Sequence, residues 1–188
     1  MILEITTHDH PALRTRGRAV EKVDAKIRRL AEEMIETMRA AEGIGLAAQQ
    51  VGLPLQLFVL DVRRMKDRPS AMRKDGKPVD FEALMPMVLI NPKIEPFGRT
   101  RIENEGCLSF PGLRGDIPRP ISVRIKAQTP DGAEIAFEAD GLLARAIQHE
   151  FDHLQGILFI DRMSAQDRLE ELPEEIRQLA RPALVGGR

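Results

Sequence analysis

The sequence predicts an α+β fold in which mixed or antiparallel sheets pack around a central helix. Three observations predict this class. Strand-like runs occupy the middle of the chain, and helical stretches lie on both sides of them. Two of these runs alternate apolar and polar residues around a short turn, which is typical of an antiparallel hairpin. A length of 188 residues matches one domain, so residues 1–188 are expected to share one core.

Composition and charge restrict the class of protein. Hydrophobic residues make up 43% of the chain and charged residues 30%, as in a soluble globular protein. With a net charge of −1 and no block of Lys and Arg, sequence-specific nucleic-acid binding is not expected. The single cysteine excludes an internal disulfide and suits a reducing compartment. No apolar run approaches the ~20 residues that cross a bilayer, and no signal peptide is visible, so a cytoplasmic protein without membrane association is predicted.

The first helix is predicted between residues 20 and 43. Apolar residues recur there at steps of three and four, which places them on one helix face. Gly43 stands where a left-handed residue is expected to end the helix. The apolar face would consist of Val20, Val23, Ile27, Leu30, Met34, Ile35 and Met38.

Strands are predicted to follow this helix. Residues 55–62 are typical of a buried strand, and 87–92 of a second one, ended by its last residue, a proline without a backbone donor. Residues 63–86 between them are polar and contain prolines, so a long surface insertion is expected. Residues 121–128 and 133–140 alternate on both sides of TPDG, which predicts the antiparallel hairpin.

The helix after the hairpin carries the chemistry. It is expected to begin after a cap at Asp140 and to end at Gly156. Within HEFDH, His149 and His153 lie four residues apart and therefore on one helix face. Two imidazoles in this arrangement can bind one metal ion, and Glu150 is free to take a proton from water. This helix is therefore the metal-binding helix expected at the centre of the sheets.

A catalytic metal site of this kind needs a third protein ligand. No histidine follows His153, and the only cysteine, Cys107, lies upstream in ENEGCLSFPG. A thiolate and two neutral imidazoles form a tetrahedral set with one position left for water. Simpler interpretations exist, because the histidines can be buried groups bonded to the backbone and the cysteine a small core residue. A metallopeptidase and a protein with a structural zinc site stay open on these residues.

The stretch GIGLAAQQVG, residues 43–52, also has two interpretations. Its small residues suit a helix stop followed by a close-packed crossing. They also suit a groove of peptide size, with the amide of Gln50 directed at a developing oxyanion. The glycines do not form the dinucleotide-binding fingerprint, because no strand leads into them.

Three stretches in this order, GIGLAAQQ, EGCLS and QHEFDH, resemble the signature motifs of the peptide deformylases. The resemblance extends to HPALR near the start, LDV and INP on the strands, RP after the cysteine and GILFID after the helix, so it covers the chain from about Met1 to Met163. It implies an enzyme that hydrolyses the N-formyl group from formyl-methionine at the start of new polypeptides. It disfavours a metallopeptidase, which would use a ligand after the helix instead of the cysteine.

The resemblance also implies a cofactor. On this sequence one divalent metal ion would be held by Cys107, His149 and His153. Ferrous iron is the expected ion, and zinc, nickel or cobalt can occupy the site.

Further roles are implied for residues around the metal. Glu150 would be the general base and then the general acid. The oxyanion would be held by the side chain of Gln50 and by the backbone N–H of Leu108. Substrate contacts are expected from Ile44, Gly45, Arg114, Leu142 and Ala146.

Two regions, the tail and the insertion at 63–86, lie outside the motifs. The implied partners are N-formylmethionyl peptides and nascent chains on the ribosome, but the predicted helical tail, residues 164–188, mixes acids and bases and therefore offers little for a ribosome anchor. In this tail, Pro173 requires a new helix to start there. Arg145 occupies a helix position where some relatives place an apolar pocket residue. The insertion at 63–86 has no assigned role.

Overall fold

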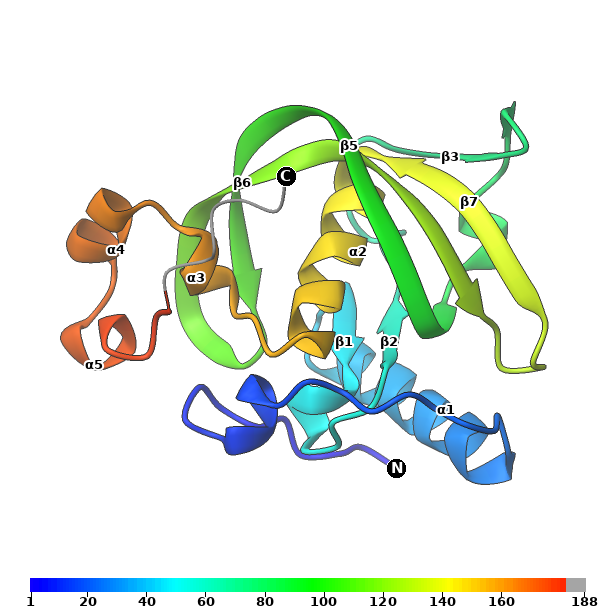
Figure 1. Ribbon diagram of the computed structural model, residues 1–188, viewed down its shortest axis with the longest axis horizontal. Helices are drawn as coiled ribbons and strands as arrows, with labels where there is room; N and C mark the ends of the chain where they lie inside the picture. Colours follow the sequence, from blue (N-terminus) through cyan, green and yellow to red (C-terminus); the bar gives the residue numbers. More distant parts are fainter. Residues whose placement is uncertain (182–188) are drawn as a thin grey trace.

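A computed structural model describes residues 1–181 of the chain (Figure 1). Seven strands form one sheet in the order β1-β2-β5-β6-β7-β3-β4, and every neighbouring pair is antiparallel. The predicted α+β class is therefore confirmed, with an antiparallel sheet. The strands are β1 (Gly45–Ala47), β2 (Leu57–Leu60), β3 (Ser70–Lys74), β4 (Lys77–Pro78), β5 (Met87–Cys107), β6 (Phe110–Gln128) and β7 (Glu134–Asp140). The helices are α1 (Ala25–Ala40), α2 (Gly141–Leu154), α3 (Phe159–Arg162), α4 (Ala165–Glu171) and α5 (Glu174–Arg177), with 3-10 turns η1 (Pro11–Arg14), η2 (Ala48–Val51) and η3 (Glu82–Leu84).

The sheet has helices on both faces at β2. Side chains alternate along a strand, so Phe58 and Leu60 pack toward α2, whereas Leu57 and Val59 pack toward α1. This explains why the whole of β2 is apolar and buried. The long hairpin of β5 and β6 curls around α2 (Figure 1).

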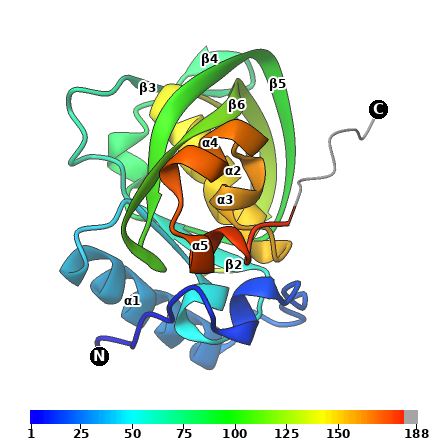
Figure 2. The same cartoon turned by 90° about the vertical axis from the view of Figure 1, so that its left-hand side faces the viewer.

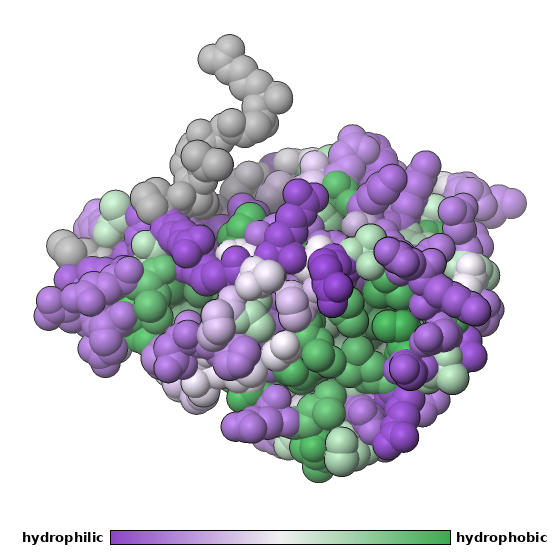
Figure 3. Space-filling model, turned by 60° about the horizontal axis from the view of Figure 1, so that its bottom comes forward, coloured by the Kyte–Doolittle hydropathy of each residue, from purple (hydrophilic) through white to green (hydrophobic). Residues whose placement is uncertain are grey.

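A third apolar cluster joins the end of the chain to the β5–β6 hairpin. Phe110 and Ile117 of β6 pack with Phe159 and Ile160 of α3 and with Ile176 of α5. Figure 2 shows α3, α4 and α5 together on this side of the molecule. Figure 3 brings forward the side that carries α1, where apolar residues are grouped among hydrophilic ones.

Helix α1 is shorter than the apolar spacing predicts. It begins at Ala25 because the carboxylate of Asp24 caps it, accepting from the backbone N–H groups of Lys26 and Ile27. Val20 and Val23 therefore precede the helix and pack in the same apolar cluster as its buried face. The left-handed residue after the helix is Glu42, with φ 56°, and not Gly43 as predicted.

Strand β5 corrects the prediction of a strand that ends at residue 92. The strand instead continues to Cys107, and its register with β6 shifts between Ile90 and Lys93. Asn91 adopts φ 50° at this irregularity, and its side chain exchanges hydrogen bonds with the backbone of Val20. The proline thus sits in a bulge, where the ladder needs no donor. The predicted hairpin at 121–140 is confirmed as β6–β7.

The start of α2 is capped differently from the prediction. Asp140 occupies the N-cap position, but its side chain makes no capping bond to α2 and instead bonds to Ser122. The first helical N–H groups donate to the backbone oxygen of Pro69 and to the hydroxyl of Ser70. The predicted stop at Gly156 is confirmed, with φ 71°.

The segment 63–86 contains β3, β4 and η3, and β3 extends the sheet by pairing with β7. The tail contains α4 and α5, and α5 starts directly after Pro173, as predicted. The rest of the predicted tail, residues 182–188, lies outside the described residues. Within residues 1–181, no helix is long and apolar enough to cross a membrane.

Candidate metal centre and catalytic pocket

Strand β5 and helix α2 bring the three predicted ligands together. One nitrogen of His149, one nitrogen of His153 and the sulfur of Cys107 all lie within 4.8 Å of one another. The sulfur is 3.3 Å from Nε2 of His153, and the centroids of the two imidazole rings are 5.1 Å apart. Cys107 ends β5, so the strand delivers the sulfur to the face of α2 that carries both histidines.

Glu150 follows His149 in α2, and its side chain lines the same pocket. It is only 4% exposed, and one of its carboxylate oxygens has no hydrogen-bond partner among the described residues. Burial raises the pKa of Glu150 to about 7. Gly45 of β1 is in direct contact with this carboxylate, because a Cβ at position 45 would lie 2.8 Å from its Cδ. Gly45, the second glycine of GIGLAAQQ, therefore leaves room for the carboxylate of Glu150.

The amide of Gln50 is held in one orientation. Its oxygen accepts from the backbone N–H of Ala47 at 2.8 Å, so its nitrogen faces the site. That nitrogen lies 3.5 Å from the sulfur of Cys107 and 3.3 Å from the hydroxyl of Ser109. Leu108, with Ser109, forms the tight turn between β5 and β6 next to the sulfur.

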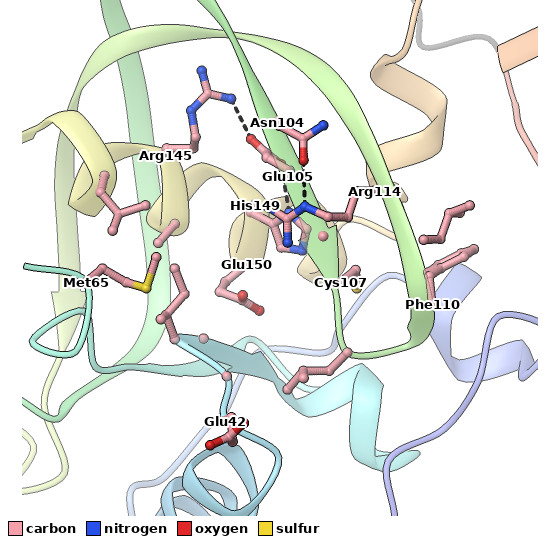
Figure 4. Close-up of a pocket in the computed structure, with 18 of the residues that line it drawn as sticks. Glu42, Met65, Asn104, Glu105, Cys107, Phe110, Arg114, Arg145, His149 and Glu150 are labelled. Carbon is pink, nitrogen blue, oxygen red and sulfur yellow. Dashed lines mark hydrogen bonds and ion pairs between the residues drawn. The ribbon is translucent and has the colours of Figure 1, made fainter. Parts of the chain in front are cut away.

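A cavity of about 490 Å³ opens onto this centre (Figure 4). Its lining includes Gln50, Cys107, Leu108, His149 and Glu150 but not His153. The five residues expected to contact substrate, Ile44, Gly45, Arg114, Leu142 and Ala146, also line it.

A buried ionic cluster behind His149 was not predicted from the sequence. We call it the Glu105 cluster, and it consists of Glu105, Arg119, Arg145 and Asp152. The carboxylate of Glu105 accepts from Nδ1 of His149 at 2.9 Å, from Nη1 of Arg145 at 2.6 Å and from Nε of Arg119 at 2.7 Å. Arg119 also donates to Asp152 at 2.7 Å. Figure 4 shows the bonds from Arg145 to Glu105 and from Glu105 to His149.

The electrostatics of the cluster follow from these contacts. Burial raises the pKa of Glu105, but the charge on Arg119 and the hydrogen bond from His149 outweigh it and hold that pKa well below its usual range. The ionised Glu105 accepts a hydrogen bond from Nδ1–H of His149, so in the neutral imidazole the lone pair lies on Nε2. Glu105 therefore sets which nitrogen of His149 can bind a cation.

A sequence signal for Glu105 did exist. Side chains two residues apart on a strand share a face, so Glu105 and Cys107 point to the same side of β5. No such local signal links Arg119 to the site, because its partners Glu105 and Asp152 lie on different elements.

The arrangement can hold a cation, polarise a carbonyl oxygen with a neutral amide, and move a proton with a buried carboxylate. These are groups that a hydrolase uses on an amide or ester substrate. The comparisons with known proteins narrow this class.

The family model for polypeptide deformylases matches residues 2–169. A peptide deformylase of Methylacidiphilum infernorum is 48% identical over 181 residues, which cover 96% of this chain and 94% of that protein. A peptide deformylase of Opitutus terrae is 43% identical, with 96% and 94% covered. The crystal structure of a peptide deformylase from Synechococcus elongatus in complex with actinonin matches with a TM-score of 0.79 and 36% identity, covering 96% of this chain and 91% of that one. The chain belongs to the peptide deformylase family and is an enzyme of that family.

Proposed function

We propose that the chain removes the N-formyl group from formyl-methionine at the start of newly synthesised polypeptides, and that it needs a divalent metal ion to do so. The observation that carries this proposal is the convergence of Cys107, His149 and His153 beside the buried carboxylate of Glu150. Membership of the peptide deformylase family supports the choice of substrate.

The donor set fits a divalent cation. One thiolate and two imidazoles suit ferrous iron, zinc, nickel or cobalt, and ferrous iron is the ion that we propose for the cell. When bound, the ion supplies a Lewis acid that polarises the formyl oxygen and lowers the pKa of a coordinated water. His149 is prepared for this role because Glu105 holds its Nδ1, which leaves its Nε2 free.

The residues around the ion divide the proton and charge movements. Glu150 takes a proton from the attacking water while the oxygen of that water bonds to the formyl carbon. Gln50, through its side-chain nitrogen, and Leu108, through its backbone N–H, donate to the oxygen that gains negative charge. A single donor of this kind typically contributes about 2.7–4 kcal/mol to transition-state stabilisation. Glu150 then returns the proton to the peptide nitrogen, the C–N bond breaks, and formate and a free α-amine leave.

The cavity suggests how the peptide is held. Ile44, Leu142 and Ala146 offer an apolar surface for the methionine side chain. The backbone of Gly45 and the side chain of Arg114 are the proposed contacts along the rest of the peptide. Arg114 is exposed and bonded to Asn104, so it can reach a peptide that extends out of the pocket.

The remaining proposals concern context. We infer that residues 1–188 act as one catalytic domain, with formyl-methionyl peptides and nascent chains as partners. The cytoplasm is the proposed place, because new chains emerge there. Ribosome association is implied by the family resemblance, and the mixed charge of the tail gives it little support.

The test is formate release from a formyl-Met tripeptide by protein loaded with Fe²⁺ or Ni²⁺ without oxygen. Glu150→Ala should keep its metal and lose about 10²–10⁴-fold in turnover, because it removes the general base. Glu95→Ala, which changes a carboxylate exposed on β5, is the control and should keep full turnover. Turnover retained by Glu150→Ala would remove Glu150 from the mechanism. Cys107→Ser should weaken or change metal binding, and an unchanged metal content would exclude the sulfur as a ligand.

A further inference from the structure

The segment 63–86 supplies side chains to the catalytic cavity, although it lies outside the motifs. Met65 and Arg68 both line the cavity. In Figure 4, Met65 lies on the other side of Glu150 from Cys107 and Phe110. The segment therefore lines the cavity on the side of Glu150 away from Cys107.

Met65 belongs to the apolar end of the cavity. Its side chain is half-buried and packs, like that of Ile44, against the core cluster that includes Leu142 and Ala146. These are the residues proposed to receive the methionine side chain of the substrate. A long side chain that enters between them would meet the flexible thioether of Met65, which adapts well to irregular apolar space.

Hydrogen bonds and one ion pair hold residues 65–68 in place beside the cavity. The backbone N–H of Met65 donates to Val62 at 3.1 Å, and that of Arg68 donates to Met65 at 3.2 Å. The guanidinium of Arg68 pairs with Glu103 of β5. Glu103 also lies 3.3 Å from Nε of Arg145, so the segment is tied to the Glu105 cluster.

The same segment caps the helix that carries the histidines. The backbone N–H groups of Leu142 and Leu143 donate to Pro69 and Ser70 at 3.0 and 3.1 Å. The backbone that carries Met65 is therefore anchored to α2, so Met65 keeps its place beside the helix that lines the cavity.

We propose that Met65 is a specificity-determining residue that contacts the first side chain of the substrate, and that Arg68 positions it through Glu103. This rests on the proposed deformylation of formyl-methionyl peptides. Met65 adds apolar contact to a long, unbranched side chain such as that of methionine or norleucine. A formyl-alanyl peptide offers only a methyl group and gains little from this contact.

The experiment compares formyl-Met, formyl-norleucine and formyl-Ala tripeptides on the metal-loaded full chain. Met65→Ala should raise KM for the two long side chains about tenfold, with kcat little changed, because it removes apolar contact made before and during the reaction. The formyl-Ala peptide should change less than twofold. Met65→Phe should lower kcat/KM for the long side chains by filling the space, and leave formyl-Ala unaffected.

Controls separate this role from a general loss of structure. Lys66→Ala changes the next residue, whose ammonium pairs with Glu82 outside the cavity, and should leave all three substrates unaffected. Arg68→Gln should shift the Met-to-Ala ratio in the same direction as Met65→Ala, and Arg68→Lys should restore part of it. A ratio that is unchanged in both Met65 variants would overturn the proposal.

Binding measurements test the role of Met65 without turnover. In a Glu150→Gln background, calorimetry with the formyl-Met and formyl-Ala peptides should show a preference for formyl-Met that Met65→Ala removes. A preference that persists after Met65→Ala would contradict the role of Met65. If the unmodified chain binds these peptides selectively but hydrolyses none of them, the proposed function is wrong, but the role of Met65 in selective binding is retained.

Discussion

The two histidines of the candidate metal centre are held in different ways. Nδ1 of His149 donates to Glu105, and three further buried charges stand behind that carboxylate. Nδ1 of His153 has no hydrogen-bond partner among the described residues. Helix α2 also contacts η2, where both amide atoms of the buried Gln49 are without a partner within residues 1–181. Charged partners therefore hold the ring of His149, whereas no hydrogen bond from residues 1–181 holds Nδ1 of His153.

This difference has consequences for stability. Charges that leave water must find good partners, and removal of one partner leaves an uncompensated buried charge. The Glu105 cluster should therefore tolerate truncation badly. The region around Gln49 contains polar atoms that contribute no protein hydrogen bond, so it should tolerate apolar replacement.

Glu105→Ala should have the largest effect. It leaves the guanidinium groups of Arg119 and Arg145 without their shared carboxylate and releases Nδ1 of His149. We expect a loss of about 3–5 kcal/mol in the free energy of unfolding of the metal-free protein. Metal affinity should fall about 10–100-fold, as for other partners of a metal-binding histidine. Urea unfolding and chelator competition measure the two quantities, and an affinity equal to that of the unmodified chain would show that Glu105 does not orient His149.

Arg119→Met should cost about 3 kcal/mol of unfolding free energy, because Glu105 and Asp152 would each lose a buried partner. Arg124→Met is the matched control. Arg124 also pairs with two carboxylates, Glu95 and Glu138, but its side chain is 50% exposed. Exposed pairs contribute little, so Arg124→Met should cost much less than Arg119→Met. Equal losses in urea unfolding would contradict the contrast between buried and exposed pairs.

Glu150→Gln should stabilise the metal-free protein in a pH-dependent way. The pKa of Glu150 is about 7 in the folded chain and 4.5 in the reference state, so the folded state binds the proton more tightly. Ionisation of Glu150 therefore reduces stability as pH rises from about 4.5 to 7. Glutamine cannot ionise, so the gain over the unmodified chain should grow from small at pH 5 to about 2–3 kcal/mol at pH 8. Thermal or urea unfolding at both pH values measures it, and a gain independent of pH would refute burial as the cause.

Gln49→Met should have the smallest effect. It replaces a buried amide that has no protein partner within residues 1–181 by an apolar side chain of similar size, so we expect a change within about 1 kcal/mol, with stabilisation the favoured sign. Gln50→Met is the comparison, because its amide makes bonds to Ala47 and Ser109. A loss at position 49 as large as that at position 50 would show that Gln49 is satisfied by groups other than protein atoms.

Much of the fold was predictable because periodicity is local. The β6–β7 hairpin and the stop of α2 at Gly156 were predicted from residues near each other in the chain. The wrong bounds predicted for α1 and β5 also have local physical reasons. A capping carboxylate at Asp24 moved the start of α1, and a bulge at Asn91 let β5 continue past a proline that usually ends a strand.

The sequence by itself determined the types of group that could bind a metal and move a proton. His149, Glu150 and His153 share a helix, and helical spacing alone places both imidazoles on one face. Tertiary structure alone decided that Cys107 meets them, that Glu105 chooses the free nitrogen of His149, and that Met65 reaches the cavity from the 63–86 segment. These contacts join residues far apart in the chain, and they form only when burial of the apolar core brings β5, α2 and the segment together.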